Sequence, residues 1–406
     1  MDFEDSPNEA SYRAAARAWI EKHGKSHVSP AKDSLSAITQ TPDVVRAREW
    51  QALKASAGYS CITLDRAWGG GGGSHTEAAI FADEEARAGI DYGIAMTVAH
   101  GMAVPTILAK GSAALQERFV RPTVRGEMIW CQLFSEPSGG SDVAAARTRA
   151  VRDGDDWVVN GQKIWTSGAQ FSDYGLLLAR TNPDAPKHKG LTMFAVNMKD
   201  PAVEVRPIHQ MNGGFEFNEV FFKDLRVSDA DRIGEIGDGW AASIVTLMNE
   251  RYTVGRPIGP SVQDVIALAR QIPGRRGSAL EDRDVREKVA DAYLALEGLN
   301  RVYLRVRTAL SRGQTPGPEN SICKLIAASQ MQSSSNEAVA AMDQFGLIDD
   351  AQLAPFDAFF QQSLLLSAGV RIAGGTDEVL RNIIAERVLG LPADIRVDKN
   401  APFNAL

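Results

Sequence analysis

The sequence predicts an α+β protein in which an antiparallel β-sheet domain stands between two helical domains. Two changes in residue periodicity predict this order. Apolar residues recur three or four positions apart from residue 8 to about 122, form short β-like runs between about 123 and 228, and return to helical spacing from about 236 to 390. The 406 residues also exceed what one compact core usually supports. We therefore expect an N-terminal helical domain at residues 1–122, a middle β domain at 123–230 and a C-terminal four-helix bundle at 231–406.

Local patterns predict the individual elements in the same order. Helical spacing in the first domain is clearest in residues 12–22, 48–58 and 75–89. Turn residues such as Asp153-Gly154 and Asn182-Pro183 separate the β-like runs of the middle domain, which are residues 128–134, 156–165, 174–180, 191–198, 203–208 and 218–227. Good helix formers dominate the last domain, in residues 239–254, 285–310, 320–342 and 378–390.

Composition argues against several classes of protein. The net charge is −7 and no basic block is present, which argues against a nucleic-acid surface and fits a soluble metabolic protein. No apolar run reaches the length of about 18 residues that a membrane span needs. Cys61, Cys131 and Cys323 lie far apart without a nearby His pair, so we expect neither a metal site nor a disulfide framework. A reducing, cytoplasmic location is the expectation.

The most informative stretch is WCQLFSEPSGGSD, residues 130–142. A predicted strand ends at Ser135-Glu136-Pro137, and small residues then lead to Asp142, so backbone amides and hydroxyls are exposed close together. Such a loop can approach a flat or anionic ligand. By residue type alone an ordinary turn explains the segment as well, because Ser, Gly and Pro are common in turns.

Four segments together resemble the acyl-CoA dehydrogenases. Residues 130–142 are similar to that family's C-x-L-T-E-P-x-x-G-S-D signature, with Ser in place of Thr. NGQKIWTSG, at the start of residues 160–180, is similar to the family's G-x-K-x-W-I-T-N/S-G motif. Residues 213–240 resemble its passage from the β domain into the C-terminal helices, and RIAGGTDEVLRNIIAERVLGLP, residues 371–392, resembles its second signature. The matches span roughly residues 10 to 392, in the family's order.

The resemblance implies FAD as cofactor and an acyl-CoA thioester as substrate. It implies that Trp165 packs on the isoalloxazine while Thr166 and Ser167 bond to the polar rim of the ring; the alternative for Trp165 is a core position on a strand. It also implies that Ser141 contacts the pantetheine arm of the acyl-CoA. The residues for which it implies FAD contacts are Gln132, Phe134, Ser135, Trp165, Thr166, Ser167, Thr376 and Glu378.

The catalytic base is assigned by the same resemblance. Dehydrogenation needs a base for the α-proton while the β-hydride leaves to flavin N5. Many members carry a Glu directly before the Gly-Thr of the last signature, but Gly374 stands there in this chain. A subset similar to long-chain and isovaleryl-CoA dehydrogenases carries the Glu before an Arg on the first long helix of the C-terminal domain, which points to Glu250 and Arg251. Glu250 also borders an apolar stripe with Ile244 and Met248.

Two supporting roles follow from the resemblance. The backbone N–H of Gly374 is expected to bind the thioester carbonyl together with a ribityl hydroxyl of FAD, because a main-chain donor survives the loss of the Glu side chain. Arg251 is expected to position substrate, with an ordinary surface ion pair as the alternative. An exposed, solvated helix position is the corresponding alternative for Glu250.

The sequence departs from the family at its FAD contacts between subunits. Members usually carry Gln followed by Gly-Gly before the last long helix, whereas this chain has Ala340, Asp343 and Gln344 there and keeps only Gly346. The familiar Arg-x-x-Phe-Gly motif is also not evident near Arg275 and Arg276.

Those departures leave two other functions open. The chain could be one subunit of a heteromeric dehydrogenase, or a flavin monooxygenase on the same fold, although such oxygenases generally lack the Glu. A non-enzymatic binding module has no use for a base. The main interpretation implies electron transfer to an electron-transferring flavoprotein, a homo- or heterotetramer, and an acyl group that the sequence does not specify.

Overall fold

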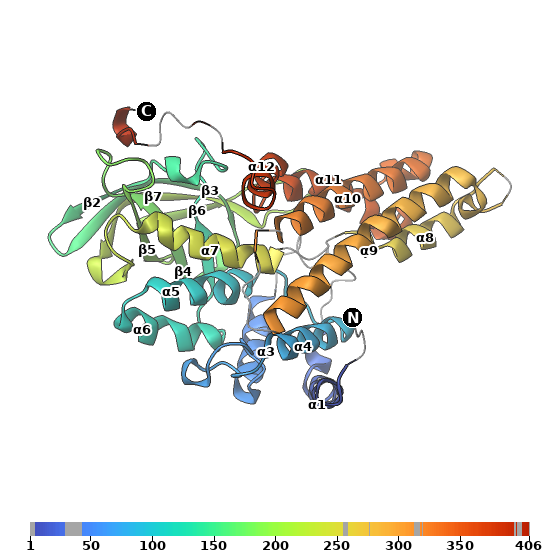
Figure 1. Ribbon diagram of the computed structural model, residues 1–406, viewed down its shortest axis with the longest axis horizontal. Helices are drawn as coiled ribbons and strands as arrows, with labels where there is room; N and C mark the ends of the chain where they lie inside the picture. Colours follow the sequence, from blue (N-terminus) through green and yellow to red (C-terminus); the bar gives the residue numbers. More distant parts are fainter. Residues whose placement is uncertain are drawn as a thin grey trace.

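The computed structural model describes residues 5–28, 43–254, 259–275, 277–311, 317–318, 320–393, 395 and 400–405. The predicted order of helical, β and helical parts is confirmed (Figure 1). Each helix or strand segment predicted from periodicity contains a helix or strand of the predicted type.

The N-terminal part is a group of short helices with strong start signals. Its α-helices are α1 (Pro7–His23), α3 (Val44–Ala57), α4 (His75–Arg87), α5 (Val104–Lys110) and α6 (Ala113–Val124). α1 and α4 each begin with a capping box, in which Ser6 pairs with Glu9 and Ser74 pairs with Glu77. A π-helical turn (Ala99–Ala103) leads directly into α5.

The middle part of the chain forms an eight-stranded sheet. Its strands are β1 (Trp130–Leu133), β2 (Arg149–Asp153), β3 (Asp156–Ser167), β4 (Tyr174–Arg180), β5 (Leu191–Asn197), β6 (Val203–Pro207), β7 (Phe217–Ser228) and β8 (Arg232–Ile233). The strand order is β6-β7-β3-β2-β4-β5-β8, and β1 pairs with β4.

Most of the pairing is antiparallel, as expected, but β4 is an exception. It runs antiparallel to β5 and parallel to both β1 and β2. The chain between β1 and β4 contains the signature loop and the β2-β3 hairpin, which is long enough for the crossover that parallel neighbours need. The signature loop follows β1, and β1 pairs with β4, the strand that comes after the second motif. The loop therefore leaves the sheet beside β4.

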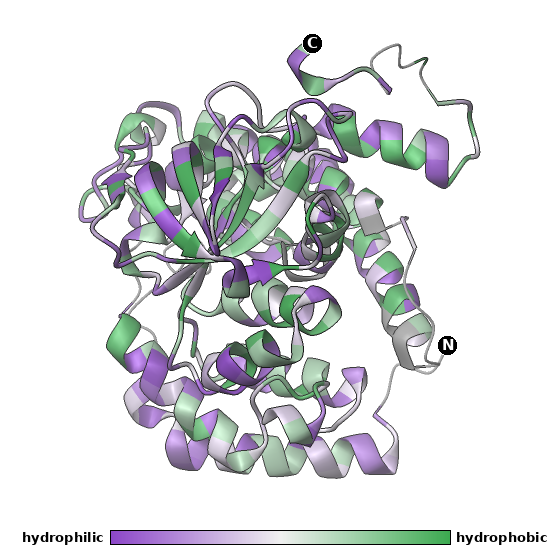
Figure 2. Ribbon diagram, turned by 90° about the vertical axis from the view of Figure 1, so that its left-hand side faces the viewer, coloured by the Kyte–Doolittle hydropathy of each residue, from purple (hydrophilic) through white to green (hydrophobic). Residues whose placement is uncertain are grey.

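β4 and β5 are buried at nearly every position because two hydrophobic clusters cover their two faces. Leu176 and Leu178 of β4 belong to the cluster beneath α5 and α6, whereas Leu177 and Ala179 belong to the cluster shared with β3 and β7. A continuous apolar run is the expected pattern for such a strand. β3 instead alternates between buried and more exposed positions, and purple and green bands alternate along the strands that face the viewer in Figure 2.

The C-terminal part contains six described α-helices. They are α7 (Gly239–Val254), α8 (Val262–Gln271), α9 (Arg283–Ser311), α10 (Asn320–Ala341), α11 (Phe359–Ile372) and α12 (Asp377–Arg387). α8 to α11 form the elongated bundle in Figure 1, and α12 follows it across the Gly374 turn.

α7 packs mainly outside the bundle. It contacts α5, the π-helical turn and β5, and the Thr246 hydroxyl bonds to that of Thr106 on α5 at 2.9 Å. Among the described bundle helices, α10 makes the main contact with α7. α7 therefore sits where the helical, β and bundle parts meet.

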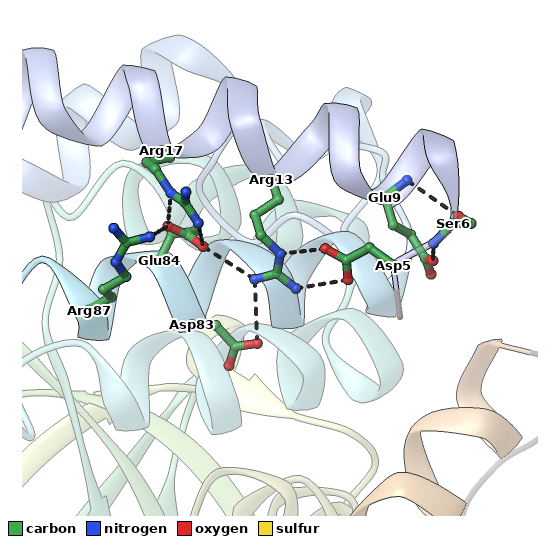
Figure 3. A network of polar contacts seen from close by, with 8 residues as sticks. All are labelled: Asp5, Ser6, Glu9, Arg13, Arg17, Asp83, Glu84 and Arg87. Carbon is green, nitrogen blue, oxygen red and sulfur yellow. Dashed lines mark hydrogen bonds and ion pairs between the residues drawn. The ribbon is translucent and has the colours of Figure 1, made fainter. Parts of the chain in front are cut away.

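A buried carboxylate joins α1 to α4 (Figure 3). The Glu84 side chain is 5% exposed and accepts hydrogen bonds from Arg17 at 2.8 and 2.9 Å and from Arg13 at 3.3 Å, while Arg87 lies 3.5 Å away. The hydrogen bonds from Arg17, helped by Arg13, lower the pKa of Glu84 despite its burial.

Glu84→Gln is expected to destabilise the fold by about 1–2 kcal/mol at pH 7, because it removes the charge that the arginines bind. The effect stays this small because the arginine side chains are partly exposed to solvent. The folded pKa of Glu84 lies below the unfolded value, so its contribution is present above the unfolded pKa and is lost as pH falls through the folded pKa. The difference in urea unfolding between wild type and variant should therefore begin to shrink near pH 4, about the unfolded pKa of a Glu, and should vanish only below the lower folded pKa. Asp83→Asn is the control, since Asp83 is half exposed and 4.0 Å from Arg13; an equal loss in both variants would contradict the prediction.

Candidate active site

The first signature segment forms a loop that is closed by its own backbone. The N–H of Glu136 donates to the carbonyl of Gly139 at 3.1 Å, and the N–H of Gly139 donates back at 2.9 Å. The Glu136 carboxylate accepts the N–H groups of Arg147 at 2.6 Å and Thr148 at 2.9 Å. Ser141 is exposed in this loop. The segment is thus a turn whose conformation is stabilised by these hydrogen bonds.

A buried ion pair ties this loop to the second motif. Lys163 of β3 is fully buried, and its Nζ donates to Glu136 Oε1 at 2.8 Å and to the carbonyl of Phe134 at 3.0 Å. Burial opposes the charge of Glu136, but attraction to Lys163 and the hydrogen bonds outweigh burial and hold the pKa of Glu136 below its usual value. Burial also opposes the charge of Lys163 and lowers its pKa, although the attraction of Glu136 partly offsets this shift. The Phe134 side chain lies in the core, so any ligand contact of this residue would be made by its backbone, whose carbonyl already accepts the bond from Lys163.

Trp165 occupies a bulge in β3. The register of β3 against β7 shifts between Lys163 and Thr166, and Trp165 has a left-handed φ of 59°. Its side chain is 56% exposed and meets the ring of Phe217 edge to face, with centroids 6.1 Å apart. Trp165 is therefore an exposed aromatic surface beside the loop, and the alternative of a core position on a strand is wrong.

The groups behind this tryptophan fit a planar ligand with a polar rim, such as the flavin that the resemblance implies. Thr166 is 1% exposed, and its hydroxyl has no hydrogen-bond partner among the described residues. Asn218 donates to the Thr166 carbonyl at 2.9 Å, while its own Oδ1 also lacks a described partner. Buried polar atoms usually have partners, so these two can bind a ligand. Ser167 lies beside them at the end of β3.

Glu250 lies close to the first signature segment. It is half-buried near the end of α7, and the Gln132 side-chain amide of β1 donates to its Oε2 at 3.4 Å. Leu247 packs on the core, whereas Ile244 and Met248 are 39% and 43% exposed. The predicted apolar stripe is thus divided between the core and an open surface. The side chain of Arg251 lies outside the described part of the structure.

The last signature segment forms a glycine turn before α12. Gly374 and Gly375 have φ values of 63° and 101°, and the second value in particular favours glycine. The Thr376 hydroxyl caps α12 by accepting the N–H of Val379 at 3.3 Å, and Glu378 is exposed in the first turn of the helix. α10 packs against both α7 and α12, so it connects the helix of Glu250 to this turn.

Two lysines that hold these segments were missed at the level of sequence. Lys163 was visible only as a letter of the G-x-K-x-W motif, although a lysine at an inward position of an alternating strand is a sign of a buried pair. Lys324 of α10 donates to carbonyls of the last signature turn, and no local pattern marks it.

Domains of one known family match most of the chain. The N-terminal domain of acyl-CoA dehydrogenase matches residues 6–127, the middle domain matches 131–225 and the C-terminal domain matches 237–389. The acyl-CoA dehydrogenase IpdE1 of Mycobacterium tuberculosis is 35% identical over 95% of this chain and 98% of its own length. The chain belongs to the acyl-CoA dehydrogenase family. Members of this family are FAD-dependent oxidoreductases that dehydrogenate acyl-CoA.

Further acyl-CoA dehydrogenases extend the comparison. FadE34 of Mycobacterium tuberculosis is 38% identical over 71% of this chain, but the match spans only 39% of that longer relative. The solved Tcur3481-Tcur3483 steroid ACAD has a TM-score of 0.81 and 27% identity, over 97% of this chain and 100% of that chain. The ChsE4-ChsE5 complex from Mycobacterium tuberculosis has a TM-score of 0.79 and 26% identity, over 97% and 100%. None of the helices in the described part of this chain combines the length and hydrophobicity that crossing a membrane requires.

Proposed function

We propose that this acyl-CoA dehydrogenase removes the α-proton and β-hydride of an acyl-CoA thioester to give the trans-2-enoyl-CoA, with Glu250 as the base. The contact between Gln132 and Glu250 carries the proposal. It places a carboxylate from α7 against the strand that leads into the flavin-binding signature, although 117 residues separate the two in the chain. An arbitrary solvated glutamate on α7 has no reason to meet that strand.

The other residues of the site have binding and positioning roles in this proposal. Trp165, Thr166, Ser167, Gln132, Ser135, Thr376, Glu378 and the backbone of Phe134 would hold FAD. FAD supplies the acceptor for the β-hydride. Ser141 would contact the pantetheine arm and Arg251 would position substrate. The backbone N–H of Gly374 would donate to the thioester carbonyl, where negative charge develops as the α-proton leaves.

The comparisons favour a bulky acyl group and a second subunit. The solved Tcur3481-Tcur3483 structure is named a steroid ACAD. Its name and that of the ChsE4-ChsE5 complex each contain two proteins. Next to the departures at Asp343 and Gln344, Phe345 and Leu347 are 51% and 86% exposed. These apolar side chains suit a covering partner chain, so a heteromeric tetramer is the second candidate. An electron-transferring flavoprotein would take the electrons onward.

Anaerobic bleaching of bound flavin tests the proposal. The purified protein is mixed with short, branched, long and steroid-side-chain acyl-CoAs, and bleaching by one class, with the steroid side chain expected, supports dehydrogenation. Purification without flavin, followed by flavin binding when a partner subunit is added, supports the heteromeric candidate. Bound FAD that no thioester bleaches would overturn the proposal and favour oxygenase chemistry on the same fold.

A further inference from the structure

Lys324 contacts the last signature turn from the side of α10. It is 8% exposed, and its Nζ donates to the carbonyl oxygens of Arg371 at 3.1 Å and Gly375 at 2.6 Å. These two carbonyls lie on either side of Gly374 in the chain. One side chain therefore bridges the end of α11 and the end of the turn before α12.

A second set of bonds fixes the same segment. Arg371 donates through Nε to Asp377 Oδ2 at 2.7 Å and through Nη1 to Gln332 Oε1 of α10 at 2.6 Å. Asp377 is 3% exposed. Burial lowers the pKa of Lys324, while the carboxylates of Asp377 and Glu378 oppose that shift and Arg371 adds to it. α10 thus bonds to the turn through Lys324 and, two helical turns further on, to the end of α11 through Gln332.

The turn needs such support because it contains two consecutive glycines. Glycine populates left-handed and right-handed conformations about equally, so Gly374-Gly375 has several accessible shapes in isolation. The bond from Lys324 directs the Gly375 carbonyl toward α10. Because a trans peptide is planar, the N–H of Thr376 in the same peptide is directed the opposite way, away from Lys324. The Gly374 N–H belongs to the preceding peptide, between residues 373 and 374, which lies in the chain between the two carbonyls that Lys324 holds. The two bonds together therefore limit the orientations open to that N–H.

We infer that Lys324 is a positioning residue, which selects the one conformation of the Gly374-Gly375 turn that aims the Gly374 N–H at the thioester carbonyl. The inference rests on the proposed function, since it assigns a use to that N–H. In chains that carry the base at position 374, a side chain occupies this turn; here the backbone remains, and its geometry depends on Lys324.

Lys324→Met tests the inference, because Met has similar length and volume but no donor. We expect the variant to fold and to retain FAD, while kcat falls by about 10- to 100-fold, since displacement of a single group by about 1 Å has effects of that size. KM should stay within about threefold, because the lost interaction forms mainly in the transition state. Lys54→Met is the matched control: Lys54 is a mostly buried lysine of α3 that pairs with Glu85 at 3.0 Å, far from the turn in sequence.

A measurement without turnover distinguishes a positioning role of Lys324 from a general loss of rigidity in the variant. A 3-thiaacyl-CoA can lose its α-proton but has a sulfur at the β position and no hydride to give. The pH at which the bound thioester loses that proton, followed by visible absorbance with bound FAD, reports carbonyl stabilisation. In Lys324→Met this apparent pKa should rise by about 1–2 units, one for each tenfold loss of stabilisation.

Each outcome decides between the two claims. If wild type bleaches and Lys324→Met matches it in kcat and in the analogue pKa, the Lys324 inference is overturned and the proposed function stands. If no acyl-CoA bleaches the wild type, the proposed function fails first. If Lys324→Met does not fold, Lys324→Gln replaces it: its shorter amide reaches at most one carbonyl, so a partial fall in kcat is expected and wild-type kcat refutes the inference.

Discussion

Glu250→Gln is expected to keep its FAD and its stability but to reduce flavin by acyl-CoA about 10²–10⁴-fold more slowly than wild type, the usual contribution of a general base. Gln has almost the same shape as Glu and can still bond to the Gln132 amide, so the local packing is retained. The neutral amide cannot accept the α-proton. Stopped-flow absorbance of the flavin under anaerobic conditions measures the rate directly.

A surface glutamate provides the control for this variant. Glu287→Gln removes a carboxylate on α9 that pairs with Arg283 at 2.7 Å and is well exposed. Its rate of flavin reduction should equal that of wild type. Unchanged reduction in Glu250→Gln would remove Glu250 from the role of base, and loss of FAD from that variant would assign it to cofactor binding instead.

Lys163→Met is expected to lower the free energy of unfolding by about 3–5 kcal/mol, because it leaves the buried carboxylate of Glu136 without its ion-pair partner. The N–H groups of Arg147 and Thr148 remain bonded to that carboxylate but carry no full charge. The signature loop then keeps only the backbone bond from the Ile164 N–H to the Ser135 carbonyl, at 2.9 Å, as a direct link to β3 among the described contacts, so FAD content should fall with stability. Urea unfolding and the flavin absorbance of the purified protein measure the two effects.

A double-mutant cycle measures the coupling free energy between Lys163 and Glu136. Glu136→Gln alone leaves the ammonium of Lys163 buried, whereas Glu136→Gln with Lys163→Met leaves no charge, so the double variant should be more stable than the sum of the single losses predicts. Arg226→Gln, which breaks exposed ion pairs with Asp153 and Asp156, should change stability little. Simple additivity of the two buried substitutions would show that Lys163 and Glu136 act independently.

The order of elements could be predicted because periodicity is a local property. Ser6 and Ser74, which cap α1 and α4, can be recognised in the sequence, and β3 alternates as a strand with one buried face does. The signature segments were found by resemblance, which has no need of the fold. The parallel pairing of β1 with β4 was not predicted, since pairing direction depends on how a 40-residue connection crosses the sheet.

The contacts that build the site could not be predicted because they join distant segments. Nothing near Lys163 in the chain indicates that its charge is met by Glu136, and nothing near Lys324 indicates the carbonyls of residues 371 and 375. The left-handed conformation of Trp165 follows from a bulge against β7, not from a glycine or turn signal. Helical spacing also predicted an apolar stripe at Ile244 and Met248, although both are partly exposed and their neighbour Leu247 packs on the core.

The position of α7 determines which parts of the site move together. α7 is bonded to α5 by Thr106 and Thr246 and to β1 through Gln132, whereas the Gly374-Gly375 turn is bonded to Lys324 of the bundle helix α10. A small rotation of the bundle against the rest of the molecule would therefore move Gly374, the proposed carbonyl donor, and leave Glu250, the proposed base, in place. The distance between these two groups is then the dimension of the proposed catalytic centre that such a rotation would change. Substitutions in the contact between α7 and α10 would retune that spacing without touching either group.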